Sequence, residues 1–347
     1  MGSRRFGRRL LNLAIIVGSL AWLAWLIYAQ HHQLGVAIAG LGHARGGLIF
    51  AAYACERLSF VSLGRMQRRL LRAGNHRLTL ASVLGIVVAG NALSVSVPIA
   101  GAGLSAAFSF REFERRQVSH HAAAFALAVS GVLSTLSLMV IAAAGALVSG
   151  NAVAAALGLL GAAAIAMAIA GALLALRVPA CQRVATRGAV GAVRLMHRVR
   201  RGSPDRKPPE LIVAETRARL AALHLSRLDW AIVVGLAFLN WLGDAACLTL
   251  SLRAAGLPIP FRQLLLIWAA GQAAGSIGLT PGGVGIVEVA LVAALTGAGE
   301  PAAGSTVAVL IYRLISLWLM LLIGWISFIL LRSRRPSPEE SPPPMSS

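Results

Sequence analysis

Long apolar runs alternate with short basic segments along this chain. Six of the runs have the length of a membrane-spanning helix, because about 20 apolar residues cross the hydrocarbon core of a bilayer. They are residues 10–29, 46–63, 121–147, 152–176, 229–252 and 304–331. The pattern predicts an all-α, multi-pass membrane protein with about six full spans.

Two further apolar stretches, residues 78–110 and 263–295, are interrupted near their middles by proline and glycine. The interruptions read PIAGAG at residues 98–103 and PGGVG at residues 281–285. Proline stops a helix because it lacks a backbone N–H and clashes with the preceding turn. We therefore expect two broken, re-entrant helical hairpins, with kinked helices in an ordinary bundle as the alternative.

The distribution of charge sets the expected orientation. Hydrophobic residues make up 57% of the 347 positions and charged residues 13%, which excludes an ordinary soluble domain. The net charge of +20 reflects the preference of Lys and Arg for cytoplasmic loops rather than nucleic-acid binding. A loop is predicted at residues 65–77, which hold five arginines, and residues 177–227 hold twelve basic residues, so both segments are predicted to be cytoplasmic. Two full spans, 121–147 and 152–176, already separate these two segments. Residues 78–110 must therefore enter and leave the membrane on the cytoplasmic side.

This placement predicts a cytoplasmic (inner) membrane protein with both termini in the cytoplasm. It puts 27 of the 32 basic residues on the cytoplasmic side and leaves Arg45, Arg253 and Arg262 outside. A basic N-terminus (1–9) precedes a first membrane repeat (10–147) and a second one (148–331), and the tail (332–347) is predicted to be disordered. The second repeat contains the basic segment 177–228.

Each half reads span, span, broken hairpin, span, and the two halves begin on opposite sides of the membrane. Three crossings per half make them inverted repeats, an arrangement typical of transporters. For residues 263–295, a re-entrant hairpin and two full spans both return the chain to the same side of the membrane, so both interpretations stay open.

Five ionisable side chains fall inside apolar spans, where each costs roughly 2.5–3.5 kcal/mol at mid-depth. They are Glu56, Arg57, Asp244, Glu288 and Arg313. Such residues carry function, or else form a buried network that holds the helices together. Asn240 shares a helix face with Asp244, and Asn91 lies on the first arm of the first hairpin.

The broken loops are candidate binding sites, because free backbone groups inside a membrane need protein or a watery cavity as partner. The helix after Gly285 presents its N-terminus to the second loop, and such a terminus suits a phosphate. Glu288 lies in its first turn and either caps it or acts as a charge site. The sequence has no HExxH, GxSxG, P-loop or CxxC motif, so no enzyme, metal or cofactor is predicted.

The run TPGGVGIVE at residues 280–288, followed by IYRLISLW at 311–318, resembles the flippase-like transmembrane domain of lysylphosphatidylglycerol synthetases. GNALSVSVP at residues 90–98 resembles the first conserved loop of that family. The resemblance implies family positions at Glu288, Tyr312 and Arg313. The first loop departs from the pattern because it lacks an adjacent Gly-Glu. The soluble synthetase domain is not expected, since sixteen residues follow the last span, so lipid aminoacylation is not expected either.

The predicted function is translocation of an anionic lipid or lipid-linked headgroup between leaflets, with membrane lipids as partners. The loops would meet near the midplane, Arg313 and Arg57 would counter the headgroup charge, and Glu288 and Asp244 would gate or carry protons. The candidate substrate-binding residues are Asn91, Pro98, Gly101, Gly103, Pro281, Gly282, Gly283, Gly285, Glu288, Tyr312 and Arg313. The alternatives are a small-solute or ion-coupled transporter and a membrane scaffold of a cell-envelope synthesis complex. The small residues of 152–176 leave homo-oligomerisation open.

Overall fold

The computed structural model describes residues 44–151, 225–257 and 259–333, together with single residues between 28 and 42 and short pieces between 153 and 167. Almost all of the predicted first span, much of the predicted span 152–176, the basic segment up to residue 224 and the tail from residue 334 lie outside these residues. The described residues form helices and turns and contain no strand.

Four helical segments in the described part are long and apolar enough to cross a membrane. They are α3 (Gly46–Ala73), α6 (His120–Val148), α10 (Arg227–Ala254) and the continuous run Ala302–Ser333. That run consists of α13 (Ala302–Arg313), a π-helical turn η2 (Leu314–Leu319) and α14 (Met320–Ser333). These helices confirm the spans predicted at 46–63, 121–147, 229–252 and 304–331.

The predicted loop at residues 65–77 is largely helical, so that prediction was wrong. Helix α3 continues to Ala73, because residues 65–73 contain no glycine or proline and because Met66, Leu70 and Leu71 are buried. Its 28 residues span about 42 Å, which exceeds the roughly 30 Å hydrocarbon core. The arginines of this segment therefore lie on a helix that extends beyond the apolar zone.

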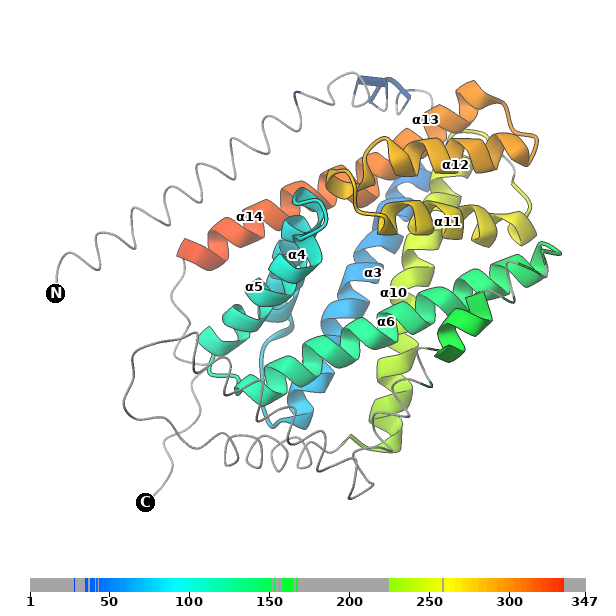
Figure 1. The fold of residues 1–347 in the computed structure, drawn as a ribbon. Helices are drawn as coiled ribbons and strands as arrows, with labels where there is room; N and C mark the ends of the chain where they lie inside the picture. Colours follow the sequence, from blue (N-terminus) through cyan, green and yellow to red (C-terminus); the bar gives the residue numbers. More distant parts are fainter. Residues whose placement is uncertain are drawn as a thin grey trace, which may run out of the picture.

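Both interrupted stretches form helical hairpins. The first contains α4 (Leu80–Ser96) and α5 (Gly101–Arg115), and the second contains α11 (Phe261–Ser276), the 3₁₀ turn η1 (Pro281–Gly283) and α12 (Ile286–Gly297). The first break is shorter than predicted, since Gly101 and Gly103 already belong to α5. Figure 1 shows the tips of the hairpins side by side, and the Ile99 N–H donates to the Gly278 carbonyl at 3.1 Å.

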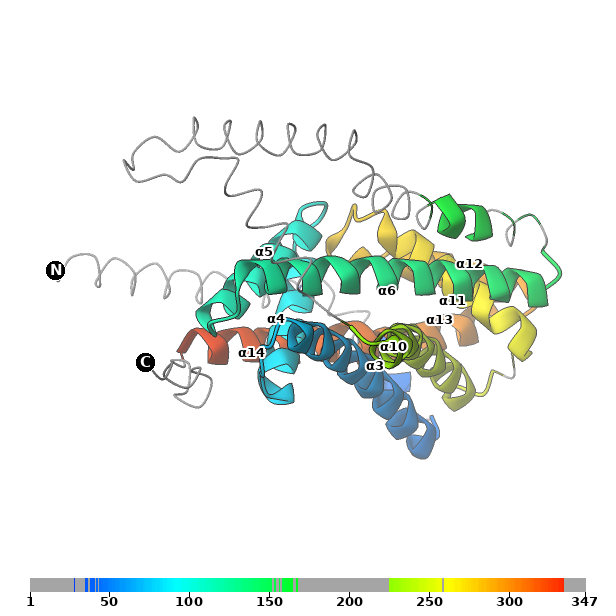
Figure 2. The ribbon, with the colours of Figure 1, turned by 90° about the horizontal axis from the view of Figure 1, so that it is seen from below.

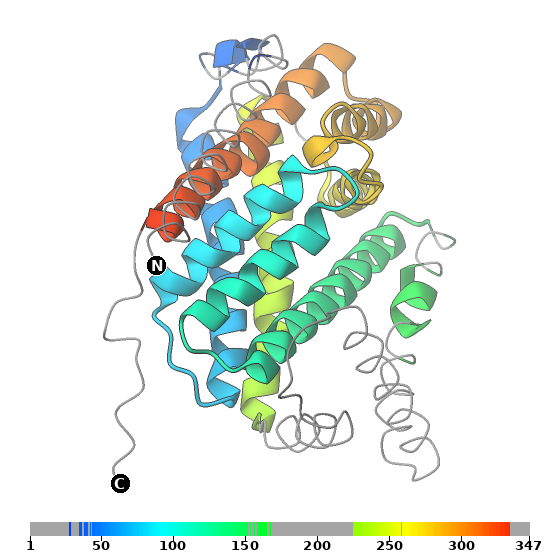
Figure 3. The ribbon, with the colours of Figure 1, turned by 60° about the vertical axis from the view of Figure 1, so that its left-hand side comes forward.

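Helices α3 and α10 pack against each other in the centre of the fold, and α6 lies across this pair on one side (Figure 2). The two central helices approach closely at Gly243, where a Cβ atom would lie 2.9 Å from the carbonyl oxygen of Cys55. Figure 3 shows α4 and α5 side by side and antiparallel, with their tip directed toward α11 and α12. The structure thus holds one hairpin tip against the other beside the central helix pair.

One end of the fold is rich in arginine. There the end of α3 meets the start of α10 through an ion pair from Arg69 Nε to Asp229 Oδ1 at 2.6 Å. The turn before α4 meets the start of α6, because His76 Nε2 lies 3.2 Å from the Ser119 backbone N–H, which donates to it. Both ends of the α4–α5 hairpin therefore lie at the basic end, as the charge pattern predicts. The second hairpin opens toward the other end (Figure 1).

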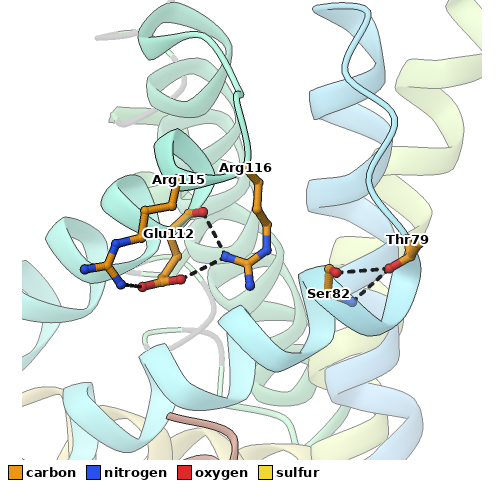
Figure 4. A network of polar contacts seen from close by, with 5 residues as sticks. All are labelled: Thr79, Ser82, Glu112, Arg115 and Arg116. Carbon is orange, nitrogen blue, oxygen red and sulfur yellow. Dashed lines mark hydrogen bonds and ion pairs between the residues drawn. The ribbon is translucent and has the colours of Figure 1, made fainter. Parts of the chain in front are cut away.

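A buried carboxylate organises the basic end of the first hairpin (Figure 4). Glu112 is 2% exposed and accepts from Arg115 Nη1 at 2.6 Å and from Arg116 Nη1 at 2.8 Å. Nearby, the Thr79 hydroxyl accepts from the Ser82 backbone N–H and caps α4. A carboxylate with two guanidinium partners offsets part of the cost of gathering arginines where α5 ends.

Candidate substrate cavity

A cavity of about 690 Å³ lies where the two hairpin tips meet the central helices. Its lining includes Glu56 from α3 and Asp244 from α10. Glu56 follows the start of α3 by ten residues, and Asp244 precedes the end of α10 by ten residues. A helix rises about 1.5 Å per residue, so Glu56 lies about 15 Å from the start of α3 and Asp244 lies about 15 Å from the end of α10. This distance is about half the thickness of a hydrocarbon core. The cavity therefore places polar groups at mid-depth of the apolar helices.

Asp244 is the most heavily hydrogen-bonded acid of the cavity. Its Oδ2 accepts from Trp268 Nε1 at 2.7 Å and from Gln272 Nε2 at 2.6 Å, and its Oδ1 accepts from Tyr312 OH at 2.9 Å. These donors come from α11 and α13, so one carboxylate ties three elements together. Hydrogen bonds to a charged acceptor are stronger than neutral ones, which lets a buried carboxylate persist.

Glu56 has a different environment. It is 3% exposed, and the groups that act on it include Asp244 and Cys247 of the neighbouring helix. Its Oε2 is buried and has no hydrogen-bond partner among the described residues. The two acids of the cavity thus interact with each other, but only Asp244 is surrounded by donors.

A third acid, Glu288, is joined to Arg313. Arg313 Nε donates to Glu288 Oε1 at 2.7 Å, and Arg313 Nη2 donates to the Gly282 carbonyl at 2.5 Å. Glu288 Oε2 accepts from the Gly285 N–H at 2.6 Å and so caps α12; Gly285 has no side chain to complete a reciprocal capping box. We call this set the hairpin latch, because it joins α13 to the tip of the second hairpin.

The tip itself requires glycine. Gly282 has φ +60°, and a Cβ atom there would lie 2.8 Å from Leu317 Cδ1 and 2.9 Å from Val95 Cγ1. Gly283 and Gly285 also have positive φ. Left-handed backbone is strained for other residues, so these positions shape the loop rather than bind through a side chain.

Comparison with known protein families identifies the family of this chain. Residues 9–324 match the family described as the lysylphosphatidylglycerol synthase TM region. The chain belongs to this family. It is a multi-pass membrane protein, and the resemblance inferred from the motifs at 280–288 and 311–318 is confirmed. No curated protein matches the chain.

The structure brings most of the predicted site residues of this family member to one place. Those that line the cavity are Asn91, Pro98, Gly101, Gly282, Gly283, Tyr312 and Arg313, together with the intramembrane acids Glu56 and Asp244. Asn240 also lines it, one turn before Asp244, and donates to Ser59 Oγ at 2.9 Å. The shared helix face predicted for Asn240 and Asp244 is therefore confirmed.

Five predicted residues do not line the cavity: Arg57, Gly103, Pro281, Gly285 and Glu288. Arg57 follows Glu56 directly, and successive helical residues point about 100° apart, so it is turned away from the acid pair. Gly103 is exposed, with no atom within 4 Å of a Cβ atom placed there. Pro281, Gly285 and Glu288 belong to the latch and the loop behind the cavity wall.

Sequence reasoning missed Trp268 and Gln272, the two donors that α11 presents to Asp244. They are four residues apart and therefore share a helix face. The polar Gln272 within an apolar stretch was the available signal. Within the described residues, no group of three His, Cys, Asp or Glu side chains is arranged to hold a metal ion.

Proposed function

We propose that this family member translocates an anionic lipid or lipid-linked headgroup between the leaflets of the inner membrane, with both termini in the cytoplasm. The observation that carries the proposal is the polar cavity at mid-depth, bounded by the tips of two hairpins that open toward opposite ends. A headgroup crossing a bilayer needs a polar path through the apolar zone, because unpaired polar groups there cost several kcal/mol each.

The first hairpin provides a place for a phosphate. Helix α5 begins at the cavity, Gly101 and Ala102 line it, and the N-cap residue Ala100 offers no side-chain cap. A helix N-terminus attracts anions through its free N–H groups and its dipole. Helix α12 is a poorer candidate, since Glu288 already caps it. A phosphate at α5 would lie in the cavity that Arg313 also lines.

In this proposal, the halves of the chain are inverted repeats and the hairpin tips form the barrier between the two sides. Opening would require the tips to part, beginning at the Ile99–Gly278 hydrogen bond. Arg313 acts mainly through the hairpin latch, because its charge is already matched by Glu288. No nucleotide site is proposed, so an ion gradient or the lipid gradient drives transport.

Leaflet exchange in proteoliposomes tests this function. Purified protein is reconstituted with headgroup-labelled anionic or zwitterionic lipid, and an external quencher reports the labelled fraction that reaches the outer leaflet. We expect quenching beyond one half, faster for the anionic lipid. Arg313→Ala should abolish it, whereas Arg253→Ala, an exposed arginine away from the cavity, should not.

Two other outcomes would redirect the proposal. A plateau at one half for every lipid, with uptake of a soluble solute by the same vesicles, would indicate the small-solute transporter. The same plateau with no uptake would indicate the scaffold, provided that each variant retains the wild-type thermal unfolding profile.

A further inference from the structure

We propose that Glu56 and Asp244 share one proton, carried by Glu56, and that the cavity is therefore a proton-binding site in addition to a lipid path. The observation behind this inference is the interaction between two buried carboxyl groups with unequal partners. The inference concerns a proton site, and only its use in transport rests on the proposed function.

Two carboxyl groups can form a hydrogen bond only if one of them carries a proton. Glu56 and Asp244 line the same cavity and interact with each other electrostatically. Both are at least nine-tenths buried. Two interacting like charges in a low-dielectric interior repel strongly, which favours a shared proton over two carboxylates.

The partners of each group decide which one carries the proton. Asp244 accepts from Trp268, Gln272 and Tyr312. An indole N–H and an amide NH₂ can only donate, so they require acceptor lone pairs and leave no place for a proton on Oδ2. Tyr312 OH adds a third donor at Oδ1, so Asp244 is the better stabilised carboxylate and the ionised member of the pair.

Glu56 has the opposite character. Among the described residues, the one donor near Glu56 besides a protonated carboxyl is the Cys247 thiol, a weak donor, and Oε2 has no partner. A carboxylate with so few donors would be poorly stabilised in this interior, whereas a carboxylic acid satisfies itself by donating to Asp244. The geometry thus gives Glu56–COOH···⁻OOC–Asp244.

The surrounding charges agree with this assignment. Helix α13 contributes Tyr312, which bonds Asp244, and Arg313, whose Nε is engaged by Glu288. Helix α10 contributes Cys247, and α3 contributes the neighbouring thiol of Cys55. Among the described groups facing Glu56, no cation pairs with it directly. Loss of the proton to water in the cavity would change the pair from one negative charge to two.

That change of charge would couple proton binding to headgroup binding. With the proton bound, the pair carries one negative charge, which Arg313 partly offsets, and repels an anionic headgroup at α5 less strongly. With the proton released, two carboxylates would repel the headgroup. A proton gradient would then bias which side of the membrane the headgroup leaves from.

Infrared spectroscopy of the full-length protein in lipid tests the proton site without transport. We expect a carbonyl band of a protonated carboxylic acid at neutral pH, shifted in D₂O and absent in Glu56→Gln. Glu300→Gln, an acid in the turn between α12 and α13, is the matched control and should keep the band. Absence of the band in wild type, or its persistence in Glu56→Gln, would overturn the assignment.

Thermal unfolding provides an independent test. Glutamine resembles a protonated Glu56 and can still donate to Asp244, so Glu56→Gln should unfold near the wild-type temperature. Asp244→Asn places an amide NH₂ among donors and should be clearly destabilised. The reverse order would overturn the assignment. In vesicles, a pH gradient should bias leaflet exchange for wild type and not for Glu56→Gln; exchange that ignores the gradient in both would refute the coupling.

The two proposals can fail separately. An infrared band that depends on Glu56, in a protein that moves no lipid, would sustain the proton site and refute lipid translocation. Lipid exchange without such a band would sustain translocation and refute the proton site.

Discussion

Replacement of Gly243 by alanine is a direct test of how α3 and α10 hold the cavity. A Cβ atom at this position would lie 2.9 Å from the Cys55 carbonyl oxygen, 3.0 Å from Ser59 Cβ and 3.1 Å from the Ser59 nitrogen. Ordinary contacts begin near 3.4 Å. Two of the three atoms belong to the backbone, so relief requires the helices to separate by about half an ångström. The matched control is Gly235→Ala on the same helix, where nothing lies within 4 Å.

The magnitude follows from two opposing effects. Alanine in a helix interior is favoured over glycine by about 0.5–1 kcal/mol, and this gain is common to both variants. Overpacking of a tight interface costs about 1–3 kcal/mol, and this loss falls on Gly243→Ala alone. The difference between the two variants therefore isolates the interface and amounts to about 1–3 kcal/mol. For soluble domains of 150–250 residues, 1 kcal/mol corresponds to about 2–4 °C in Tm.

Thiol exposure on heating is the suitable assay, because buried Cys247 and half-buried Cys55 lie at this interface. The protein in detergent micelles is heated with a thiol-reactive fluorophore, and the midpoint is compared between variants. We expect Gly243→Ala to react several degrees below Gly235→Ala. Equal midpoints would refute the reasoning, since they would mean that the helices separate without cost.

Three further predictions concern side-chain partners. His76 accepts a hydrogen bond from the Ser119 N–H, which requires a neutral ring, and burial lowers its pKa. Its stabilising contribution is therefore complete above the unfolded pKa of about 6.5 and lost as the pH falls through the lower folded pKa, so His76→Asn should flatten the Tm profile between pH 5 and 8. Trp268→Phe should cost about 1.5–3 kcal/mol, because Asp244 loses a charge-assisted bond, and more than Trp241→Phe, which frees only the Ser134 carbonyl. Glu112→Gln should lower Tm by the equivalent of about 1–3 kcal/mol, while Glu114→Gln, at an exposed contact with His120, should not; equal effects would contradict the burial argument.

The sequence predicted the hairpins because proline and glycine interrupt otherwise unbroken apolar runs, and such interruptions have few structural solutions inside a membrane. The prediction ended helix α3 at residue 63, whereas α3 ends at Ala73. A run of arginines marks the boundary of the membrane and not the end of the helix. Residues 65–73 form helix on the same apolar face that begins within the span. Only Gly74, with no further helical signal after it, ends the helix.

The candidate site was predictable in its charges and not in their partners. Spacing along the chain could not decide whether Glu56 or Arg57 faces the cavity, because neighbours on a helix differ by about 100° and the sequence does not mark the buried side. The donors Trp268 and Gln272 lie on α11 of the second hairpin, whereas Asp244 lies on α10, so only tertiary packing brings them together. Gly101 was predicted to bind substrate, yet it is buried where α5 closes against the Ser94 carbonyl of α4, so it also serves packing.

Four buried ionisable side chains form two pairs that respond differently to a proton: Glu288 with Arg313, and Glu56 with Asp244. Glu288 is held by a guanidinium and a backbone N–H, so protonating it would break an ion pair and uncap α12. Glu56 has neither partner, and its proton can leave without breaking a bond to any cation. Because protonation of Glu288 would break these bonds, the hairpin latch fits a structural role. Of the two pairs, we therefore expect Glu56–Asp244 to exchange a proton, because its ionisation costs repulsion between two carboxylates but breaks no ion pair.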